Sequence, residues 1–322
     1  MPYISSMYQI NIMISALIYI MLGLGLNIVV GLAGQLVLGY AAFYAVGAYT
    51  YGLLNTYFGL GFWAVLPVGG IMAALFGLML GFPVLRLKGD YLAIVTLAFG
   101  EIIKSIITNV YLGVDENGLQ FSFLSNKNEL ADGGVELIRG PMGVMNTQRI
   151  STFIAGFVLV LVALVVIFNL VNSRTGRAVM AARDNRIAAE SVGISVTKYK
   201  MIAFVVSAAL AGAAGTLYGC SQTTFAATKF DFNTSILILV FVVLGGLGNM
   251  WGSVIAAAAL TILPEALRQF SNYRMLVYAI VLILVMLATN NPTLKGFFSR
   301  LFHRERADAP HAAAVKGGGS KQ

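Results

Sequence analysis

Residues 173–200 read SRTGRAVMAARDNRIAAESVGISVTKYK and separate two long apolar segments. Neither flanking segment, 150–171 or 201–228, contains an Asp, Glu, Lys or Arg residue. Each is longer than the roughly 20 apolar residues that a helix needs to cross about 30 Å of hydrocarbon. The sequence therefore predicts a polar, basic loop between two membrane-spanning helices.

The composition indicates a membrane protein throughout. Hydrophobic residues make up 58% of the chain, charged residues make up 11%, and the mean hydropathy is +0.83. Ordinary globular chains carry about 25% charged residues. We therefore expect an all-α, polytopic integral membrane protein, with one transmembrane domain over residues 1–291 and a basic, disordered tail over residues 292–322.

Residues that carry redox, metal or covalent chemistry are scarce. Cys220 is the single cysteine, and both histidines, His303 and His311, lie in the polar tail. An internal disulfide and a cysteine-based metal cluster are thereby excluded. The tail sequence VKGGGSKQ lacks the spacing of a nucleotide-binding loop. We expect no catalytic residue, no metal and no cofactor, and any ATP hydrolysis would belong to another chain.

The charge pattern orients the chain in the membrane. Residues 172–200 and 292–322 each hold six Lys and Arg residues against two acidic ones, whereas residues 113–149 hold five acidic residues against three basic ones. By the positive-inside rule the first two segments are cytoplasmic, and alternation places 113–149 in the periplasm. The basic residues do not form one face interleaved with aromatic residues, so nucleic acid is not an expected partner.

The apolar segments predict about 8–10 transmembrane helices. The favoured count is about nine crossings, or eight if some segments are re-entrant. The segment 234–265 can be one long helix or two short ones broken at 245–249. Two short crossings return the basic tail to the cytoplasm, so we favour the break. The other predicted spans are 8–30, 35–57, 62–85, 91–112, 150–171, 201–221 and 275–291.

Glycine-rich interruptions occur in corresponding parts of the two halves, at 31–39 and 245–252. Unwound backbone in a membrane is tolerated where protein or water covers it, so such breaks can mark a transport path. The alternative is close helix packing through small residues, with no transport role. The candidate path or gating residues at these breaks are Gly34, Gln35, Gly39, Gly245, Gly246 and Gly248.

Glu101 and Lys104 lie inside a predicted span at i,i+3 spacing. An unpaired charge there costs about 3 kcal/mol on insertion scales, so we expect the two side chains to pair. Such a pair can fix helix packing or reach an interface, or it can contribute to gating and the path.

Four stretches in order resemble the branched-chain amino acid permeases of ABC importers, the Liv system, and its M-type subunit in particular. They are GLNIVVGLAGQLVLGYAAFYAVGAYT (25–50), LKGDYLAIVTLAFGEIIK (87–104), RAVMAARDNRIAAESVGISVTKYKMIAFVVSAALAGAAGTLYG (177–219) and VLGGLGNMWGSVIAAAALTILPE (243–265). The resemblance covers roughly residues 15–290.

The resemblance implies a subunit of a heteromeric importer in the bacterial inner membrane. Such a subunit forms half of the path for leucine, isoleucine and valine beside a homologous permease, with membrane lipid around both. Two ATP-binding subunits would bind on the cytoplasmic side, and a periplasmic binding protein would deliver the amino acid.

The resemblance also makes 172–200 the loop that couples to the ATPase. The family's EAA motif is matched loosely by Ala188-Ala189-Glu190 and more firmly by the glycine at 193. Helix-favouring residues predict one helix over 176–191, closed by Gly193 in a left-handed conformation. The alternative is an ordinary solvated loop. The three residues at 183–185 would lie mid-helix and are the leading candidates for contact with the ATPase. The full set of expected coupling residues is Arg177, Arg183, Asp184, Asn185, Ala189, Glu190 and Gly193.

Other functions stay open at this point. Within importers, the alternative is a permease for urea, short amides or other amino acids. An ion-coupled secondary transporter would show more acidic or histidine residues in the membrane than Glu101 and Glu265. A subunit that serves assembly alone is the remaining class.

Overall fold

The computed structural model describes residues 7–87, 89–115, 118–123, 135–145, 153–266, 280 and 283. The chain divides into two units, 1–275 and 276–322, and the helices and strands named below belong to the first. The predicted span 275–291 and the tail 292–322 lie outside the described residues, apart from Ile280 and Ile283. Their place in the topology stays a prediction.

The described part of the first unit is built from apolar helices. Six segments of this part are long and apolar enough to cross a membrane, which confirms the all-α membrane class. Helices α2 and α10, which are not among these six segments, pack against them. The helices are α1 (Met7–Asn27), continued by the π-helical turn η1 (Ile28–Leu32), α2 (Ala41–Phe58), α3 (Phe62–Val84), α4 (Asp90–Asn109), α5 (Phe153–Asn172), α8 (Val196–Ser221), α9 (Phe232–Gly245) and α10 (Met250–Ala266).

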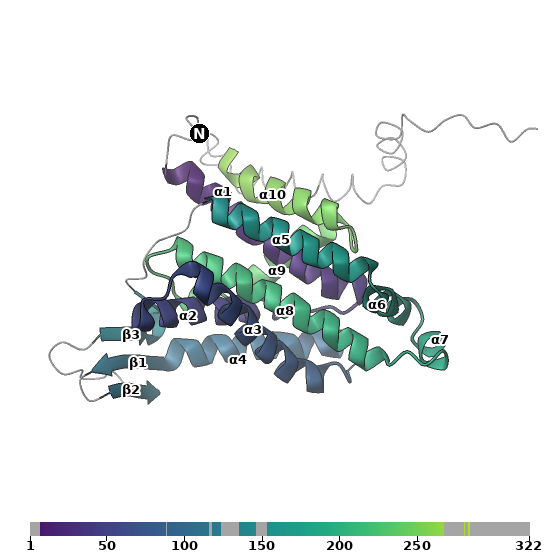
Figure 1. The fold of residues 1–322 in the computed structure, drawn as a ribbon, viewed down its shortest axis with the longest axis horizontal. Coiled ribbons are helices and arrows are strands. Elements are labelled where there is room, and N and C mark those ends of the chain that lie inside the picture. Colours follow the sequence, from purple (N-terminus) through teal and green to yellow (C-terminus); the bar gives the residue numbers. More distant parts are fainter. Residues whose placement is uncertain are drawn as a thin grey trace, which may run out of the picture. The chain divides into compact units, whose positions relative to one another are not determined.

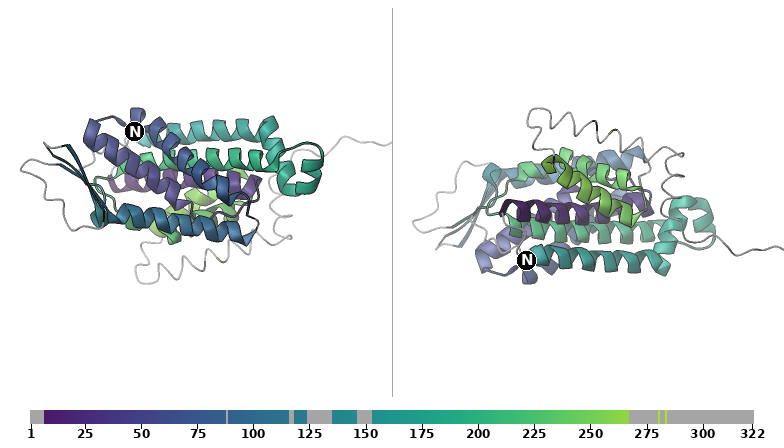
Figure 2. Two further views of the ribbon diagram at one scale, coloured as in Figure 1. Left: turned by 90° about the horizontal axis from the view of Figure 1, so that it is seen from below. Right: turned by 90° about the horizontal axis from the view of Figure 1, so that it is seen from above.

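The long helices run side by side along one direction (Figures 1 and 2). Helix α8 packs against α2 and α3, while α1 packs against α10, α8 and α5. Small residues make the approach of α8 close: a Cβ atom at Gly47 would collide with the carbonyl of Gly212, and one at Gly215 with the carbonyl of Tyr44. Such contacts between backbones are typical of helix pairs in membranes.

A small antiparallel sheet, which the sequence analysis did not predict, follows α4. Its strands β1 (Val110–Asp115), β2 (Gly118–Phe123) and β3 (Val135–Arg139) are arranged in the order β2-β1-β3. Strands β1 and β2 pair from Val110↔Phe123 to Asp115↔Gly118. Acidic residues, Asn and Gly at 115–118 favour a tight turn, and β-branched and aromatic residues around them favour strands. The predicted span 91–112 accordingly ends at Asn109.

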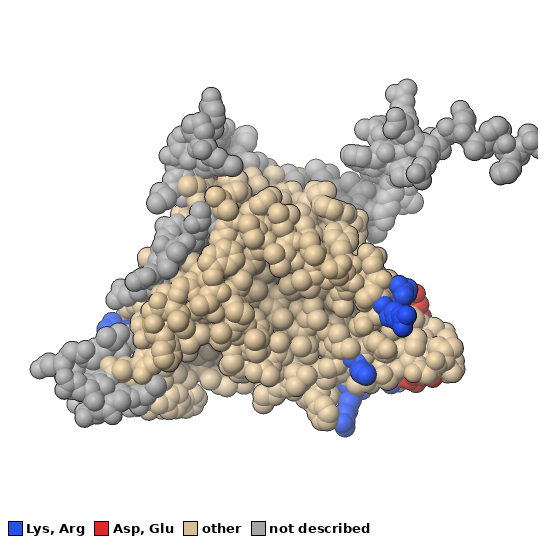
Figure 3. Space-filling model, in the orientation of Figure 1, with Lys and Arg blue, Asp and Glu red and all other residues tan. Residues whose placement is uncertain are grey.

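The sheet and the helices of the 173–200 segment, α6 (Arg174–Asp184) and α7 (Arg186–Ser191), lie at opposite ends of the bundle (Figure 1). On the face drawn in Figure 3, most charged side chains gather at the α6–α7 end, and the surface over the helices is almost free of charge. This arrangement supports the prediction that the 113–149 and 172–200 segments lie on opposite sides of a membrane.

Both predicted interruptions are present, but several predicted span boundaries were wrong. Helix α8, for example, begins at Val196 and not at residue 201. Helix α9 ends at Gly245 and α10 begins at Met250, so the 234–265 segment is broken. The predicted span 35–57 instead begins at Ala41, because η1 ends at Leu32 and the chain between them is not helical.

Candidate functional site

The 173–200 segment forms two short helices, not the single helix predicted over 176–191. Asn185 separates α6 from α7, with φ −150° and ψ 104°, and its side-chain oxygen accepts a hydrogen bond from the N–H of Ala188 at 3.1 Å. Asparagine is among the strongest N-capping residues. The three residues 183–185 therefore lie at a helix junction, not mid-helix.

Gly193 ends α7 as predicted, with φ +83°. The N–H of Gly193 bonds to the carbonyl of Glu190 at 3.1 Å, and the N–H of Ile194 bonds to that of Ala189 at 3.0 Å. This pair of bonds is the Schellman motif, in which glycine supplies the left-handed residue. Ile194 packs on a small cluster of Ala182, Ala189 and Val196, which joins α6, α7 and α8.

Three of the expected coupling residues have structural partners within the loop. Arg177 donates a hydrogen bond to the carbonyl of Asn172 at 2.9 Å, near the end of α5. Glu190 pairs with Arg186 at 2.9 Å, and Ala189 is buried. These contacts hold the loop in shape, and they leave Asp184, Ile187 and Val192 exposed.

Arg183 connects this loop to the membrane helices. Its Nη1 donates a hydrogen bond to the carbonyl oxygen of Gly31 in η1. Gly34, three residues after Gly31, also lies against the Arg183 side chain: a Cβ atom at Gly34 would lie 2.9 Å from Cγ of Arg183. Gly34 has φ +66°, a conformation that side chains with a Cβ rarely adopt.

The two glycine breaks, far apart in the sequence, meet at this point. The side chain of Asn27 is fully buried, accepts a hydrogen bond from the N–H of Gly248 at 2.8 Å and donates one to Ser253 Oγ at 2.9 Å. A Cβ atom at Gly31 would lie 2.9 Å from Cα of Gly248, which has φ +86°. The first break, the second break and α6 therefore form one contact cluster.

The remaining break glycines have packing explanations. A Cβ atom at Gly39 would collide with the carbonyl of Thr96 on α4, and one at Gly245 would lie 2.6 Å from the carbonyl of Gly252 on α10. Gly246 has φ +90° at the turn between α9 and α10. For Gly39 and Gly245 the close-packing alternative accounts for the residue, and a role in the path stays a prediction.

Side chains of two other helices bind backbone N–H groups at the end of the unwound segment 33–40 and at the first residue of α2. The N–H of Leu38 donates to Thr96 Oγ1 of α4 at 3.2 Å, and the N–H of Ala41 donates to Ser235 Oγ of α9 at 3.0 Å. Backbone N–H groups in a membrane need such partners. Two helices, α4 and α9, thereby hold the start of α2 in place.

Glu101 and Lys104 form the expected ion pair, with 3.5 Å between Oε2 and Nζ. Their side chains are 47% and 29% exposed. Asp231, just before α9, is close enough for its charge to interact with Lys104. This part of α4 therefore carries exposed charge within a candidate membrane span.

Two groups of residues escaped the sequence analysis. Asn27 is one of few polar side chains in a long apolar segment, which was an available signal. Ile187 and Val192 are 80% and 74% exposed, although both are apolar. They are exposed apolar side chains in a segment that is otherwise polar.

Comparison with known proteins gives a consistent family. The family model described as branched-chain amino acid transport system / permease component matches residues 8–286. Over 296 residues, 89% of this chain and 70% of each relative, the chain is 42% identical to the high-affinity branched-chain amino acid transport system permease protein LivM of Salmonella typhimurium and to that of Escherichia coli. Over 211 residues it is 27% identical to the fructose import permease protein FruG of Bifidobacterium longum, covering 62% of this chain and 58% of that protein. No solved structure matches the chain.

The apolar helices and the family match together identify a multi-pass membrane permease. The chain belongs to the family of branched-chain amino acid transport permease components.

Proposed function

We propose that this chain is the permease subunit of an ATP-driven importer of the bacterial inner membrane and forms half of the path for leucine, isoleucine and valine. The observation that carries the proposal is the 42% identity, over 89% of the chain, to permeases named for branched-chain amino acid transport. The importer would also contain a homologous permease, two ATP-binding subunits and a periplasmic binding protein.

The exposed charges of α4 support a path or a subunit interface on that side of the bundle. Glu101 and Lys104 sit within a candidate span, and charges facing lipid at that depth are costly. They therefore face either the partner permease or water in the path. The middle of α4, the first turn of α9 and the end of the 33–40 segment meet around Gly39 and Ser235. This contact brings the first break close to Glu101 and supports the proposal.

The contacts of α6 support a mechanism for coupling. Ile187 and Val192 would bury their exposed surface against an ATP-binding subunit, since interface energy concentrates in a few well-placed side chains. Motion of α7 would pass to α6 through the cluster of Ala182, Ala189 and Val196. Arg183 would then move the first break by its bond to Gly31, and Asn27 would carry that motion to the second.

Reconstitution tests this proposal. Proteoliposomes containing the complex purified with this chain, supplied with ATP inside and the binding protein outside, should accumulate leucine, isoleucine and valine. Urea, acetamide, ribose and fructose serve as matched competitors, because the first two represent the alternative importer class and the sugars represent the more distant relatives. Uptake that needs an ion gradient and no ATP would contradict the proposal and indicate a secondary transporter.

A further inference from the structure

The segment after β3 is fastened to the connection between α8 and α9. Val144 and Phe225 exchange two backbone hydrogen bonds, with 3.1 Å from the N–H of Val144 to the carbonyl of Phe225 and 3.2 Å for the reverse bond. Both residues are buried. Gly143 permits this approach, because a Cβ atom there would collide with the carbonyl of Phe225. Residues 140–145 therefore form a strap from the small sheet to the helical bundle.

The strap closes over a cluster of aromatic side chains. The Phe225 ring lies 5.3 Å from that of Tyr49 on α2 and 6.0 Å from that of Tyr218 on α8, measured between centroids. Phe230, just before α9, lies 4.9 Å from Tyr44 on α2 in the same way. The cluster thereby joins α2, α8 and the start of α9 beneath the strap.

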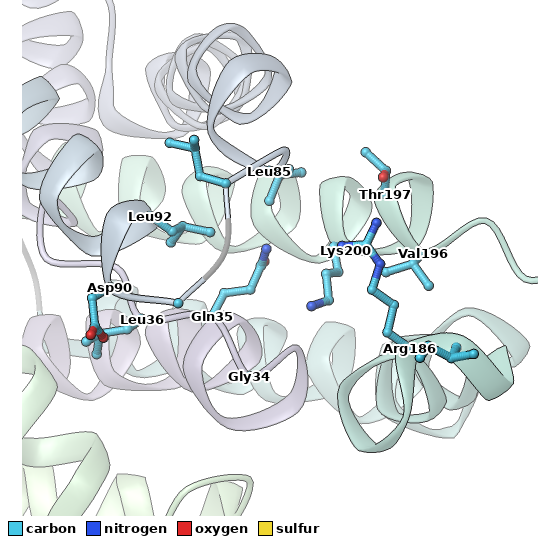
Figure 4. Close-up of a pocket in the computed structure, with 13 residues that line it drawn as sticks. Gly34, Gln35, Leu36, Leu85, Asp90, Leu92, Arg186, Val196, Thr197 and Lys200 are labelled. Atoms are coloured by element: carbon cyan, nitrogen blue, oxygen red, sulfur yellow. The ribbon is translucent and has the colours of Figure 1, made fainter. Parts of the chain in front are cut away.

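The unwound segment 33–40 is open on one side and packed on the other. A cavity of about 470 Å³ borders residues 34–36 from the side of α7 and the first turn of α8, and Figure 4 shows Gln35 and Leu36 at its edge. The space beside Gly39 and Phe230 measures only about 10 Å³, and one water molecule needs about 10–15 Å³. The described residues therefore leave this segment open toward the coupling loop and closed toward the strap.

One buried hydroxyl group in the aromatic cluster lacks a partner. Tyr49 is 5% exposed, and its hydroxyl forms no hydrogen bond with the described residues. Tyr40, at the start of the same helix, shows the usual arrangement, because its hydroxyl donates to the carbonyl of Ser207 at 3.0 Å. A buried hydroxyl without a partner destabilises the arrangement that buries it. Opening of the cluster to water would pair the Tyr49 hydroxyl, which favours a second, open arrangement.

The residues that the strap holds lead directly to the first break. Phe225 lies six residues before Asp231, which caps α9 by accepting a hydrogen bond from the N–H of Thr234 at 2.9 Å. Ser235, in the first turn of α9, accepts a hydrogen bond from the N–H of Ala41 at the start of α2. A shift of residues 225–231 would therefore move the start of α9 and the end of the unwound segment together.

We propose that the strap is a conformational device that keeps this subunit closed at the sheet end and separates from Phe225 in each transport cycle to admit substrate. The pairing of Val144 with Phe225 is isolated, so it can break without unpairing a whole strand. Water would then bind the freed backbone groups and the Tyr49 hydroxyl. The admission of substrate at this end rests on the proposed function.

A disulfide across the pair tests the proposal. Residues that exchange both backbone bonds lie about 5.5 Å apart at Cα, within the range of about 4.4–6.8 Å found in disulfides. Val144→Cys with Phe225→Cys, in a Cys220→Ala background, should therefore cross-link when the purified complex is oxidised. In proteoliposomes with ATP and the binding protein, we expect the oxidised complex to take up leucine at least tenfold more slowly than the same complex after reduction. This comparison cancels any effect of losing the Phe225 ring.

Leu112→Cys with Phe121→Cys is the matched control, because these residues lie opposite each other in β1 and β2 and their disulfide stays within the sheet. Oxidation should leave its uptake unchanged. Equal uptake by the oxidised and reduced forms of the Val144 and Phe225 double variant, with the disulfide verified by mass spectrometry, would overturn the proposal. Failure of those two cysteines to cross-link would contradict the pairing itself.

The unpaired hydroxyl gives a second test. Tyr49→Phe removes the hydroxyl and keeps the ring, so it should raise the thermal stability of the complex and slow uptake per complex several-fold by favouring the closed arrangement. Tyr40→Phe removes a hydroxyl that has a partner and should lower thermal stability instead. Wild-type stability and uptake in the Tyr49→Phe complex would refute the proposed opening of the cluster.

The same preparations separate the strap from the proposed function. Absence of leucine uptake by the wild-type complex would refute the transport function. Leucine uptake that the verified disulfide does not slow would refute the role of the strap and leave the transport function standing.

Discussion

Nη1 of Arg183 donates a hydrogen bond to the backbone carbonyl of Gly31, 152 residues earlier in the chain. The bond fastens α6, in the polar loop, to the end of η1, where the first membrane helix stops. Since the N–H of Gly248 binds the Asn27 side chain one turn away, the second break shares this support. In the proposed coupling mechanism, motion of the loop would reach both breaks through Arg183.

Replacing Arg183 by alanine should uncouple the loop from the breaks. We expect ATP-driven uptake to fall by about tenfold or more, which corresponds to loss of a charge-assisted hydrogen bond of about 1.5–3 kcal/mol. Co-purification of the ATP-binding subunits should persist, because Arg183 points toward Gly31. Arg174→Ala removes the same charge from the exposed start of α6 and is the control. Equal losses in the two variants would mean that loop charge, not the bond to Gly31, matters.

The backbone at Gly34 gives a second prediction. Gly34→Ala places a Cβ atom 2.9 Å from Arg183 Cγ and imposes a left-handed conformation on a residue that disfavours it, at a cost of about 1–2 kcal/mol. Gly59→Ala carries the same conformational penalty at φ +63°, with no atom within 4 Å of the new Cβ. We expect both variants to lower thermal stability and only Gly34→Ala to lower uptake per purified complex. Matching uptake in the two would show that Gly34 is needed for folding alone.

The sequence predicted the membrane class, most of the spans and both glycine breaks, because each depends on local composition. It misplaced the start of α2, since the unwound residues before Ala41 are held by Thr96 and Ser235, whose hydroxyl groups come from other helices. It did not predict the contact between the breaks. That contact depends on how α1, α9 and α10 pack, which no local pattern encodes.

The exposed apolar residues of α7 and the turn after it should bind the ATP-binding subunit. Ile187→Asp and Val192→Asp each place a charge on the contact surface, and we expect either to weaken the association by about 2 kcal/mol or more. Phe121→Asp, at an apolar position that is 64% exposed at the opposite end of the molecule, is the control. Pull-down of the ATP-binding subunits with purified membranes measures the effect. Undiminished recovery with both variants would place the docking surface elsewhere.

The two ends of the bundle should face opposite compartments. Ser195→Cys lies beside α7 and Ser122→Cys lies in β2, and the native Cys220 is buried. In intact cells, an impermeant thiol reagent should label the cysteine at 122 and leave the one at 195 unlabelled until the membrane is opened. The reverse pattern would invert the predicted orientation.

The coupling residues show where pattern-based prediction fails at a site. Asn185 was predicted to lie mid-helix, but it ends α6 and caps α7. Arg183 was expected to face a partner protein, yet its guanidinium binds the backbone of η1. The sequence of a basic loop does not reveal in which direction each charged side chain points. Ile187 and Val192, which are exposed, were passed over because apolar residues seldom signal a docking surface in sequence alone.

Variants of the Glu101–Lys104 ion pair can show whether the pair serves helix packing or the transport path. Glu101→Gln alone would leave Lys104 without its 3.5 Å partner and should lower the amount of assembled complex. The double variant Glu101→Gln, Lys104→Met removes both charges, and replacing an ion pair in this way is often neutral or stabilising. We therefore expect the double variant to restore assembly.

Uptake per complex should nevertheless stay several-fold below wild type, because the polar surface beside Gly39 and Asp231 would be lost. Full recovery of both assembly and uptake would assign the pair to helix packing, and Leu97→Ala on the same helix controls for small changes in its surface.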